Sequence, residues 1–422
     1  MSKYHSLYGQ MLYVENFNQA WESVKGNAGA KGVDGQTIEQ FGEDWVNSLA
    51  QVWRECKSKT YKAQPVRRVY IDKASGGKRP LGIPSVRDRI VQQALRQVLE
   101  PIFDPMFQDC SFGFRPGRSA HMAIDRVSDY VEAGFEWVVD ADLKGYFDTI
   151  PHDKLIDRVA EVVADGSILK LIRQFLKAGV MEDGKVAVAE EGTPQGGVIS
   201  PLLANIYLNP FDKRMVERGH KIVRYADDFV ILCKSPRAAE RVMESIKEYL
   251  EGELGLTLHP EKSKVVHLTE GFDFLGYHFF KAHGKPMRRP MDKKLDVFQD
   301  KIRELTLRNQ TVSMTALVGK LNPYLRGWGR YFGYGNVLSR LKELDGWIRR
   351  RIRAVQLRSW RKVRKLHRML REKGWRKDSL LGLRMTKWRS SSCPMVHAAL
   401  DLVWFKQIGL VSLASLYRAR TS

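Results

Sequence analysis

The sequence predicts an α+β protein with more than one domain. Its 422 residues exceed the length of one ordinary domain, and 43% of them are hydrophobic, which is enough to form packed cores. Short apolar runs rich in β-branched residues predict buried strands between residues 137 and 233, whereas the segments after Gly276 have the periodicity of helices. We therefore expect a mixed α/β part followed by a helical part.

The N-terminal region is expected to be helical over Phe17–Val24 and Phe41–Lys57, with a Gly-rich loop at Asn27–Gly35 between them. A strand is expected at Arg67–Asp72 because its residues alternate in character. Further helices are expected at Arg87–Leu99, Lys154–Val163, Ile168–Ala178, Pro201–Leu208, Lys293–Arg308, Thr315–Tyr331 and Leu338–Trp360.

Carboxylates occur where apolar strands end. Asp142 ends the strand predicted at Trp137–Leu143, and Ala226-Asp227-Asp228 separates two short apolar runs that predict a hairpin. Carboxylates in such places are costly unless a partner neutralises them, and divalent cations are common partners. This pattern is typical of a site for two Mg²⁺ ions that promote in-line displacement at phosphorus. We expect Asp140 to face away from this site, where it would be a structural residue.

Positive charge is concentrated in the C-terminal third. Residues 281–422 contain 34 Lys and Arg against nine Asp and Glu, a net charge of +25, so residues 1–280 carry −3 of the total of +22. This asymmetry favours a nucleic-acid-binding region after a nearly neutral body. Four cations at helical spacings predict a stripe that faces phosphates: Arg349, Arg350, Arg353 and Arg361. The alternative is a solvated helix face.

Cysteine usage and hydropathy exclude other classes. The four cysteines, Cys56, Cys110, Cys233 and Cys393, are far apart in sequence and indicate neither a zinc site nor a disulfide framework. No stretch approaches the roughly 18–20 apolar residues that a membrane helix needs. We expect a cytoplasmic protein without membrane contact.

Several motifs follow one another in the order of the polymerase blocks of a known family. They are KRPLGIP (Lys78–Pro84), SFGFRPGRSAH (Ser111–His121), DLKGYFD (Asp142–Asp148), GTPQGGVISPLLANIYLN (Gly192–Asn209), YADD (Tyr225–Asp228), HPEKSK (His259–Lys264) and FDFLGYHF (Phe272–Phe279). From about Asn27 to the C-terminus the chain resembles group II intron-encoded reverse transcriptases. It resembles their short class, usually associated with group IIC introns, which lacks a Cys-rich endonuclease domain.

The resemblance implies a right-hand polymerase with fingers and a palm that contains an antiparallel sheet, a helical thumb and a small C-terminal DNA-binding domain. The implied limits are an N-terminal extension at 1–65, fingers and palm at 66–280, a thumb or maturase region at 281–365 and a basic DNA-binding region at 366–422. It also implies two Mg²⁺ ions, an intron RNA template, a DNA target and primer, and deoxynucleoside triphosphates as substrates. In the cell, such a protein would assist splicing and retrohoming of its intron.

Individual roles follow from the same resemblance. Asp142 and Asp227 would ligate both metals, with Asp228 supporting the site. Nucleotide-binding roles are implied for Lys73 and Arg79 at the triphosphate, Gln195 beside the nucleotide, Lys262 near the leaving pyrophosphate and Arg115 near the templating pair. Phe147 would exclude the ribose 2′-hydroxyl. Without the resemblance, the cations would be surface residues, Gln195 part of a Gly-rich turn and Phe147 part of the core.

Two other functions remain open from the sequence. One is an RNA-binding splicing maturase that no longer polymerises, although such proteins typically lose the acidic ligands that this chain retains. The other is a domesticated relative that acts in DNA repair or phage defence. The sequence predicts no oligomeric state.

Overall fold

The computed structural model describes residues 3–72, 77–182, 184–187, 191–307, 312–360, 362–376 and 388–421. It divides the chain into two compact units, Met1–Leu275 and Gly276–Ser422, and each is described by itself. The finer division into four segments remains an expectation.

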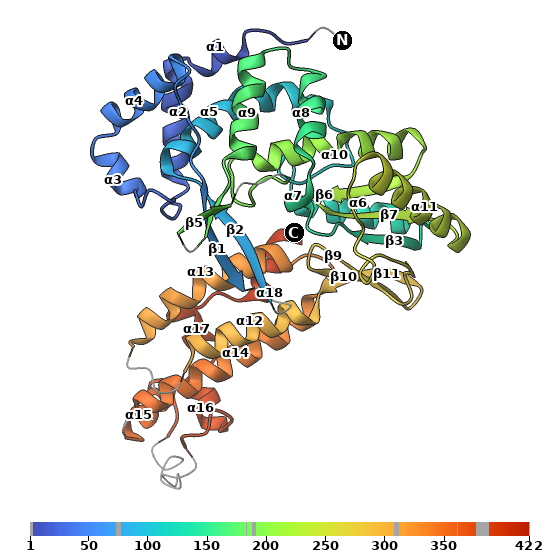
Figure 1. The fold of residues 1–422 in the computed structure, drawn as a ribbon. Coiled ribbons are helices and arrows are strands. Elements are labelled where there is room, and N and C mark those ends of the chain that lie inside the picture. Colours follow the sequence, from blue (N-terminus) through green and yellow to red (C-terminus); the bar gives the residue numbers. More distant parts are fainter. Residues whose placement is uncertain are drawn as a thin grey trace. The chain divides into compact units, whose positions relative to one another are not determined.

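The first unit contains both helices and strands (Figure 1). Its helices are α1 (Leu7–Met11), α2 (Val14–Gly26), α3 (Ile38–Glu43), α4 (Trp45–Lys57), α5 (Val86–Phe103), α6 (Ala120–Glu132), α7 (Tyr146–Thr149), α8 (His152–Ala160), α9 (Gly166–Lys177), α10 (Ser200–Glu217) and α11 (Pro236–Glu248), with a 3₁₀ turn at Asp104–Met106 and a π-helical turn at Tyr249–Glu253. Its strands are β1 (Val66–Asp72), β2 (Lys78–Ile83), β3 (Trp137–Asp142), β4 (Val180–Glu182), β5 (Lys185–Ala187), β6 (Lys221–Tyr225), β7 (Asp228–Cys233), β8 (Lys264–His267) and β9 (Phe272–Phe274).

A four-stranded antiparallel sheet with the order β6-β7-β3-β8 carries the carboxylates predicted from the sequence. The hairpin between β6 and β7 is confirmed, and its last pair joins Tyr225 to Asp228. β3 lies beside β7 with Asp142 opposite Asp228. Helices α6, α10 and α11 pack against this sheet, and most residues of β6 and β7 are buried.

A second sheet has the order β2-β1-β4-β5. β1 and β2 form a regular antiparallel hairpin, in which Arg67 is paired with Ile83 and Asp72 with Lys78. β1 also pairs in parallel with β4 at Val66 and Val180. The hairpin is therefore anchored at its base, on the side where α9 ends.

One hydrophobic core extends from Leu7 in α1 to Leu258 after α11, so the N-terminal helices share a core with the central sheet. The helix predicted at Phe41–Lys57 is interrupted at Asp44, which separates α3 from α4. The Gly-rich loop is fixed by two arginines: Arg67 donates to the carbonyl of Lys31, and Arg89 donates to that of Ala30. This loop is thereby tied to the base of the β1–β2 hairpin and to α5.

The second unit is mainly helical. Its elements are β10 (Tyr277–Ala282), β11 (Lys285–Pro290), α12 (Asp292–Leu305), α13 (Met314–Phe332), α14 (Leu338–Ser359), α15 (Arg364–Glu372), α16 (Pro394–Ala399), α17 (Leu402–Gln407) and α18 (Leu413–Thr421). Leu and aromatic side chains of α12, α13 and α14 form its main core together with Phe405 and Leu413. Buried Asp345 of α14 fixes α18, because its carboxylate accepts hydrogen bonds from the backbone N–H groups of Leu413 and Ala414.

The three long helices expected after Gly276 are confirmed within three residues at each end. The β10–β11 hairpin was not predicted. β11 reads Lys-Pro-Met-Arg-Arg-Pro, and two prolines in six residues argue against a strand unless it lies at a sheet edge, as β11 does. Among the described residues, no helix has the length and apolar character needed to span a membrane.

Candidate active site

Carboxylates from two strands and a turn meet at one end of the central sheet. Asp142 is the last residue of β3, Asp228 begins β7 directly opposite, and Asp227 lies in the turn before it. Asp140 was expected to face away, and that expectation was wrong. Residues two apart in a strand share a face, and Asp140 contributes most among the charged neighbours that raise the pKa of Asp228.

Burial and the proximity of other carboxylates raise the pKa values of three of these groups. The pKa of Asp228 is raised to about 7, first by burial and then by the charges of neighbouring carboxylates. Burial also raises the pKa of Asp140 to about 6, although Lys264 opposes the shift. The pKa of Asp227 is raised by burial and by Asp142, whereas Arg79 and Arg224 lower it. A cation placed among these groups would therefore stabilise their charged forms.

The donor set fits Mg²⁺ that is shared with a substrate. Among the described residues, no three His, Cys, Asp or Glu side chains form a preformed metal cage. Mg²⁺ is usually held by one or two carboxylates together with substrate phosphates and water, and Asp142 and Asp227 would supply those two carboxylates. A cation already contacts one of them, because Lys262 Nζ lies 2.7 Å from Asp142 Oδ2.

A buried arginine, Arg224, supports the turn that carries Asp227. Arg224 and Asp212 form an ion pair in which both side chains are completely buried. Arg224 Nη1 also donates to the carbonyl of Ala226 at 2.8 Å and to Asn205 Oδ1 at 3.0 Å. Burial opposes the charged form of Arg224, yet Asp212 raises its pKa above the usual value. Ala226 has a positive φ of 60°, which disfavours a non-glycine residue, so its carbonyl contact stabilises a strained turn.

Segment 110–113 completes this support. Arg224 pairs through its backbone with Cys110 and Phe112, and its Nη2 donates to Ser111 Oγ at 2.8 Å. A Cβ atom on Gly113 would lie 2.3 Å from the backbone nitrogen of Ala226, so only glycine fits this close approach. The conformation of the turn is thus set by residues from three separate parts of the chain.

The loop that contains Gln195 is attached to the β1–β2 hairpin. The Gln195 carbonyl accepts a hydrogen bond from Gly82 N at 2.7 Å. Gly196 has a φ of 115°, and a Cβ there would lie 2.6 Å from the Gly82 carbonyl oxygen. Arg79, exposed on β2, acts electrostatically on both Asp227 and Asp148. These residues therefore belong to the same neighbourhood as the carboxylates, and Lys73 lies outside the described residues.

Phe147 lies in α7, five residues after Asp142, and is 9% exposed. Its ring contacts the ring of Tyr146 edge-on, and its carbonyl accepts from Thr193 N at 2.6 Å. Tyr146 is fully buried and donates to the carbonyl of Ala204. Phe147 is therefore well fixed, and its effect on sugar choice remains a prediction.

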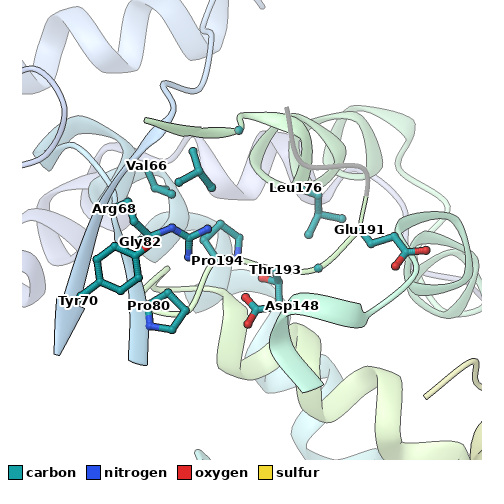
Figure 2. Close-up of a pocket in the computed structure, with 13 residues that line it drawn as sticks. Val66, Arg68, Tyr70, Pro80, Gly82, Asp148, Leu176, Glu191, Thr193 and Pro194 are labelled. Atoms are coloured by element: carbon teal, nitrogen blue, oxygen red, sulfur yellow. The ribbon is translucent and has the colours of Figure 1, made fainter. Parts of the chain in front are cut away.

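A cavity of about 290 Å³ lies beside this loop and was not predicted from the sequence. Figure 2 shows Arg68 of β1 extending into it towards Pro194, with the Asp148 carboxyl group beside Thr193. Burial raises the pKa of Asp148, whereas Arg68 and Arg79 lower it. Asp148 thus links the β1–β2 hairpin electrostatically to α7. In the sequence, the available signal for this residue was its position directly after Phe147.

Arg115 was predicted to lie near the templating base pair, which stays a prediction, and the structure places it in the loop before α6. It is 9% exposed, and its guanidinium donates to Asp104 Oδ1 and to the carbonyls of Asp104, Gln108 and Ser111. These bonds use four of the five N–H groups of the guanidinium, so Arg115 fixes the loop before α6.

The predicted basic stripe is not one surface. Arg353 is 7% exposed, donates to the Leu400 carbonyl at 3.0 Å and lies over the Phe405 ring, so it belongs to the interior of the second unit. Arg349 and Arg350 line two different cavities of that unit. Arg361 lies outside the described residues. The stripe was inferred from spacing alone, which does not reveal what packs against α14 from later in the chain.

Comparison with known proteins defines the class. Residues 71–279 match the reverse transcriptase (RNA-dependent DNA polymerase) family, and residues 295–375 match the maturase-specific domain of group II introns. Protein YkfC of Escherichia coli (strain K12) is 36% identical over 337 residues, which cover 71% of this chain and 86% of YkfC. The group II intron-encoded protein LtrA of Lactococcus lactis subsp. cremoris is 32% identical over 375 residues, which cover 71% of this chain and 62% of LtrA.

Among solved structures, a partial Cas6-RT-Cas1--Cas2 complex is similar at 25% identity over 59% of this chain and 43% of that chain, with a TM-score of 0.39. This TM-score is too low for an element-by-element comparison. The family matches and YkfC are sufficient for the assignment: the chain is a reverse transcriptase by family. It belongs to the group II intron type, in which the polymerase domain is followed by a maturase-specific domain.

Substitutions in the buried Arg224–Asp212 pair can distinguish an effect on the stability of the fold from an effect on the geometry of the turn that carries Asp227. Asp212→Asn leaves Arg224 buried without its counter-charge, which is expected to destabilise the fold by about 3–5 kcal/mol. The double variant Arg224→Met/Asp212→Leu removes both charges, so much of the stability should return. Primer extension by the double variant should nevertheless be slower than that of the wild type, because the carbonyl of Ala226 has lost its hydrogen-bond donor Arg224.

Urea unfolding and single-turnover extension on the same preparations test this prediction. Asp129→Asn, at an exposed position of α6, is the control for substitution as such. If the double variant recovers stability and also extends primers at the wild-type rate, Arg224 supports the fold but does not position the turn.

Proposed function

We propose that this chain copies RNA into DNA, extending a primer with deoxynucleoside triphosphates, with two Mg²⁺ ions at Asp142 and Asp227. The observation that carries the proposal is the meeting of these carboxylates with Arg79 and Lys262 at one end of the central sheet. Carboxylates that bind metal and cations that bind phosphate are the two groups that phosphoryl transfer requires.

In this proposal the β1–β2 hairpin and its loop form the fingers, the central sheet forms the palm, residues 281–365 form the thumb or maturase region, and residues 366–422 bind DNA. The N-terminal extension at 1–65 would cover the fingers through its Gly-rich loop. Support comes from the matches to the polymerase and maturase domains, which occupy consecutive parts of the chain.

The chain's own residues would orient the reactants. Arg79 would hold the triphosphate against the carboxylates, and Lys262 would leave Asp142 and accompany the leaving pyrophosphate. Gln195 would contact the nucleotide, since Gly196 brings its loop against β2. Asp228 would remain behind the metal ligands as a support. When bound, two Mg²⁺ ions about 3.5–4 Å apart would stabilise charge on the attacking and leaving oxygens.

We further propose that Phe147 selects deoxyribose. It is rigidly packed in α7, five residues after Asp142, and a bulky ring there would leave no space for a 2′-hydroxyl. The intron RNA as template, the DNA target and primer, and assistance to splicing belong to the same proposal. Their support is the maturase-specific domain. A maturase without polymerase activity is disfavoured, because Asp142 and Asp227 are intact and are held in place by buried contacts.

The first test removes one carboxylate at a time. Asp142→Asn or Asp227→Asn should lower primer extension by at least about 10²–10³-fold, the usual cost of losing one preorganised electrostatic group. RNA affinity should stay near that of the wild type, because these residues lie apart from the basic second unit in sequence. The measurement is single-turnover extension on an RNA template, together with an RNA-binding titration.

Asp129→Asn is the control here as well, since it removes an exposed charge of the first unit. Extension at the wild-type rate by either active-site variant would exclude these residues as metal ligands.

The second test concerns sugar choice. Phe147→Val should raise kcat/KM for ribonucleotides relative to deoxynucleotides, because a smaller side chain admits the 2′-hydroxyl. Phe175→Val is a matched control, since Phe175 is a buried aromatic residue of α9 and its truncation costs packing energy of the same kind. An unchanged ratio in Phe147→Val, with stability reduced as in the control, would mean that Phe147 serves only the core.

A further inference from the structure

The second unit contains a cavity of about 390 Å³ between α14, α17 and α18. Four basic side chains line it: Lys342, Arg349, Lys406 and Arg418. The first two lie on α14 seven residues apart, which is two helical turns and therefore one face. The other two come from α17 and α18, so three elements bring positive charge to one cavity.

Asp345 is the one acidic residue that lines the cavity, and its single charge offsets only part of the four positive charges. Asp345 is 5% exposed, and its carboxylate accepts hydrogen bonds from Ser412 Oγ, Leu413 N and Ala414 N. Its carboxylate is therefore held at the start of α18. Across the described residues, no ion pair is found for Lys342, Arg349 or Lys406, and the ion pairs nearby join other residues, such as Arg340 with Glu343.

The positive charge continues beneath the floor of the cavity. Phe405 forms part of that floor, and the Arg353 guanidinium lies 5.1 Å from its ring centroid on the buried side. Burial, and then the charge of Arg349, lower the pKa of Arg353. Like charges held around one low-dielectric cavity raise the local concentration of anions.

The shape and the lining indicate the kind of anion. The rim residues Lys342, Lys406, Arg418 and Ser415 are exposed, whereas the buried lining combines apolar Ile348 and Phe405 with Asp345. Long basic side chains that keep their stems on apolar surface and their charged ends in water are suited to phosphates that approach from solvent. The second unit as a whole is strongly basic, since residues 281–422 carry +25. A polyanion complements both the rim and the unit.

We propose that this cavity is a binding site for the phosphate backbone of a nucleic-acid strand, contacted by Lys342, Arg349, Lys406 and Arg418. The inference rests on the proposed function. It retains Arg349 from the stripe predicted from spacing and joins it to three cations outside that stripe. Lys406 and Arg418 lie 47 and 59 residues after Ser359, the last residue of α14, so neither belongs to that stripe. The backbone contacts serve affinity and register, and the carboxylates of the first unit serve the chemistry.

The test compares two double variants with equal loss of charge. Lys342→Gln/Lys406→Gln removes two exposed cations from the rim, and Lys293→Gln/Lys320→Gln removes two exposed cations of α12 and α13 outside the cavity. Binding of labelled single-stranded RNA and of DNA of the same sequence is titrated over a range of salt concentrations. For the rim variant, the slope of log K against log salt should decrease by about 1.4, because each lost phosphate contact on a single strand removes about 0.7.

A second variant, Ser415→Glu, tests the site while every basic side chain of the cavity is retained. Ser415→Glu places a negative charge on the rim and should weaken binding of both probes, whereas Thr315→Glu, at an exposed position of α13, should not. Urea unfolding confirms that all variants are folded. Equal losses on RNA and DNA indicate backbone phosphates, and a loss confined to RNA indicates that the 2′-hydroxyl contributes at the same site.

Wild-type slopes in the rim variant, or equal reductions in both double variants, would overturn the proposal and leave only a diffuse positive field. If the wild type itself fails to extend primers, the proposed polymerase function fails, while the binding comparison still decides whether the cavity is a site.

Discussion

The candidate active site depends on a buried, neutral ion pair that supports a group of crowded negative charges. Arg224 and Asp212 are both completely buried, and the same guanidinium reaches the carbonyl of Ala226 in the turn that carries Asp227. It also lowers the pKa of Asp227, which burial and Asp142 raise. One side chain therefore fixes the turn and offsets part of its electrostatic cost. A buried pair is a weak source of stability, and its contact with the Ala226 carbonyl gives buried Arg224 of β6 a geometric role.

Close backbone approaches connect this centre to the surrounding loops. Gly113 contacts the turn at Ala226, and Gly196 contacts β2 at Gly82; in both places a Cβ atom would collide with backbone. The hairpin that carries Arg79, the loop that carries Gln195 and the turn that carries Asp227 are consequently positioned by main-chain contacts, which are more rigid than contacts between long side chains. Asp148 adds an electrostatic link between the hairpin and α7.

The sequence predicted the features that have a local signal. Apolar runs identified β3 and the β6–β7 hairpin. The end of the first run pointed to Asp142, and the turn between the two strands of the hairpin pointed to Asp227. Features that depend on distant packing were missed or misplaced. Spacing on α14 suggested that Arg353 faces solvent, but Phe405 and the Leu400 carbonyl cover it. The four acceptors from residues 104–111 that bind Arg115 were also not predicted, and its role at the nucleotide stays a prediction. The cation within the apolar run Ile222–Tyr225 was the available signal for Arg224.

The central claim is that Asp142 and Asp227 hold two metal ions at the end of the central sheet. The most direct measurement is a crystal structure with an RNA template, a DNA primer, an unreactive deoxynucleotide analogue and Mn²⁺, with anomalous scattering used to locate the metal. The account predicts two peaks about 3.5–4 Å apart, both in contact with these carboxylates, with Lys262 displaced from Asp142. Metal peaks elsewhere, or a bound nucleotide without metal at these two aspartates, would contradict it.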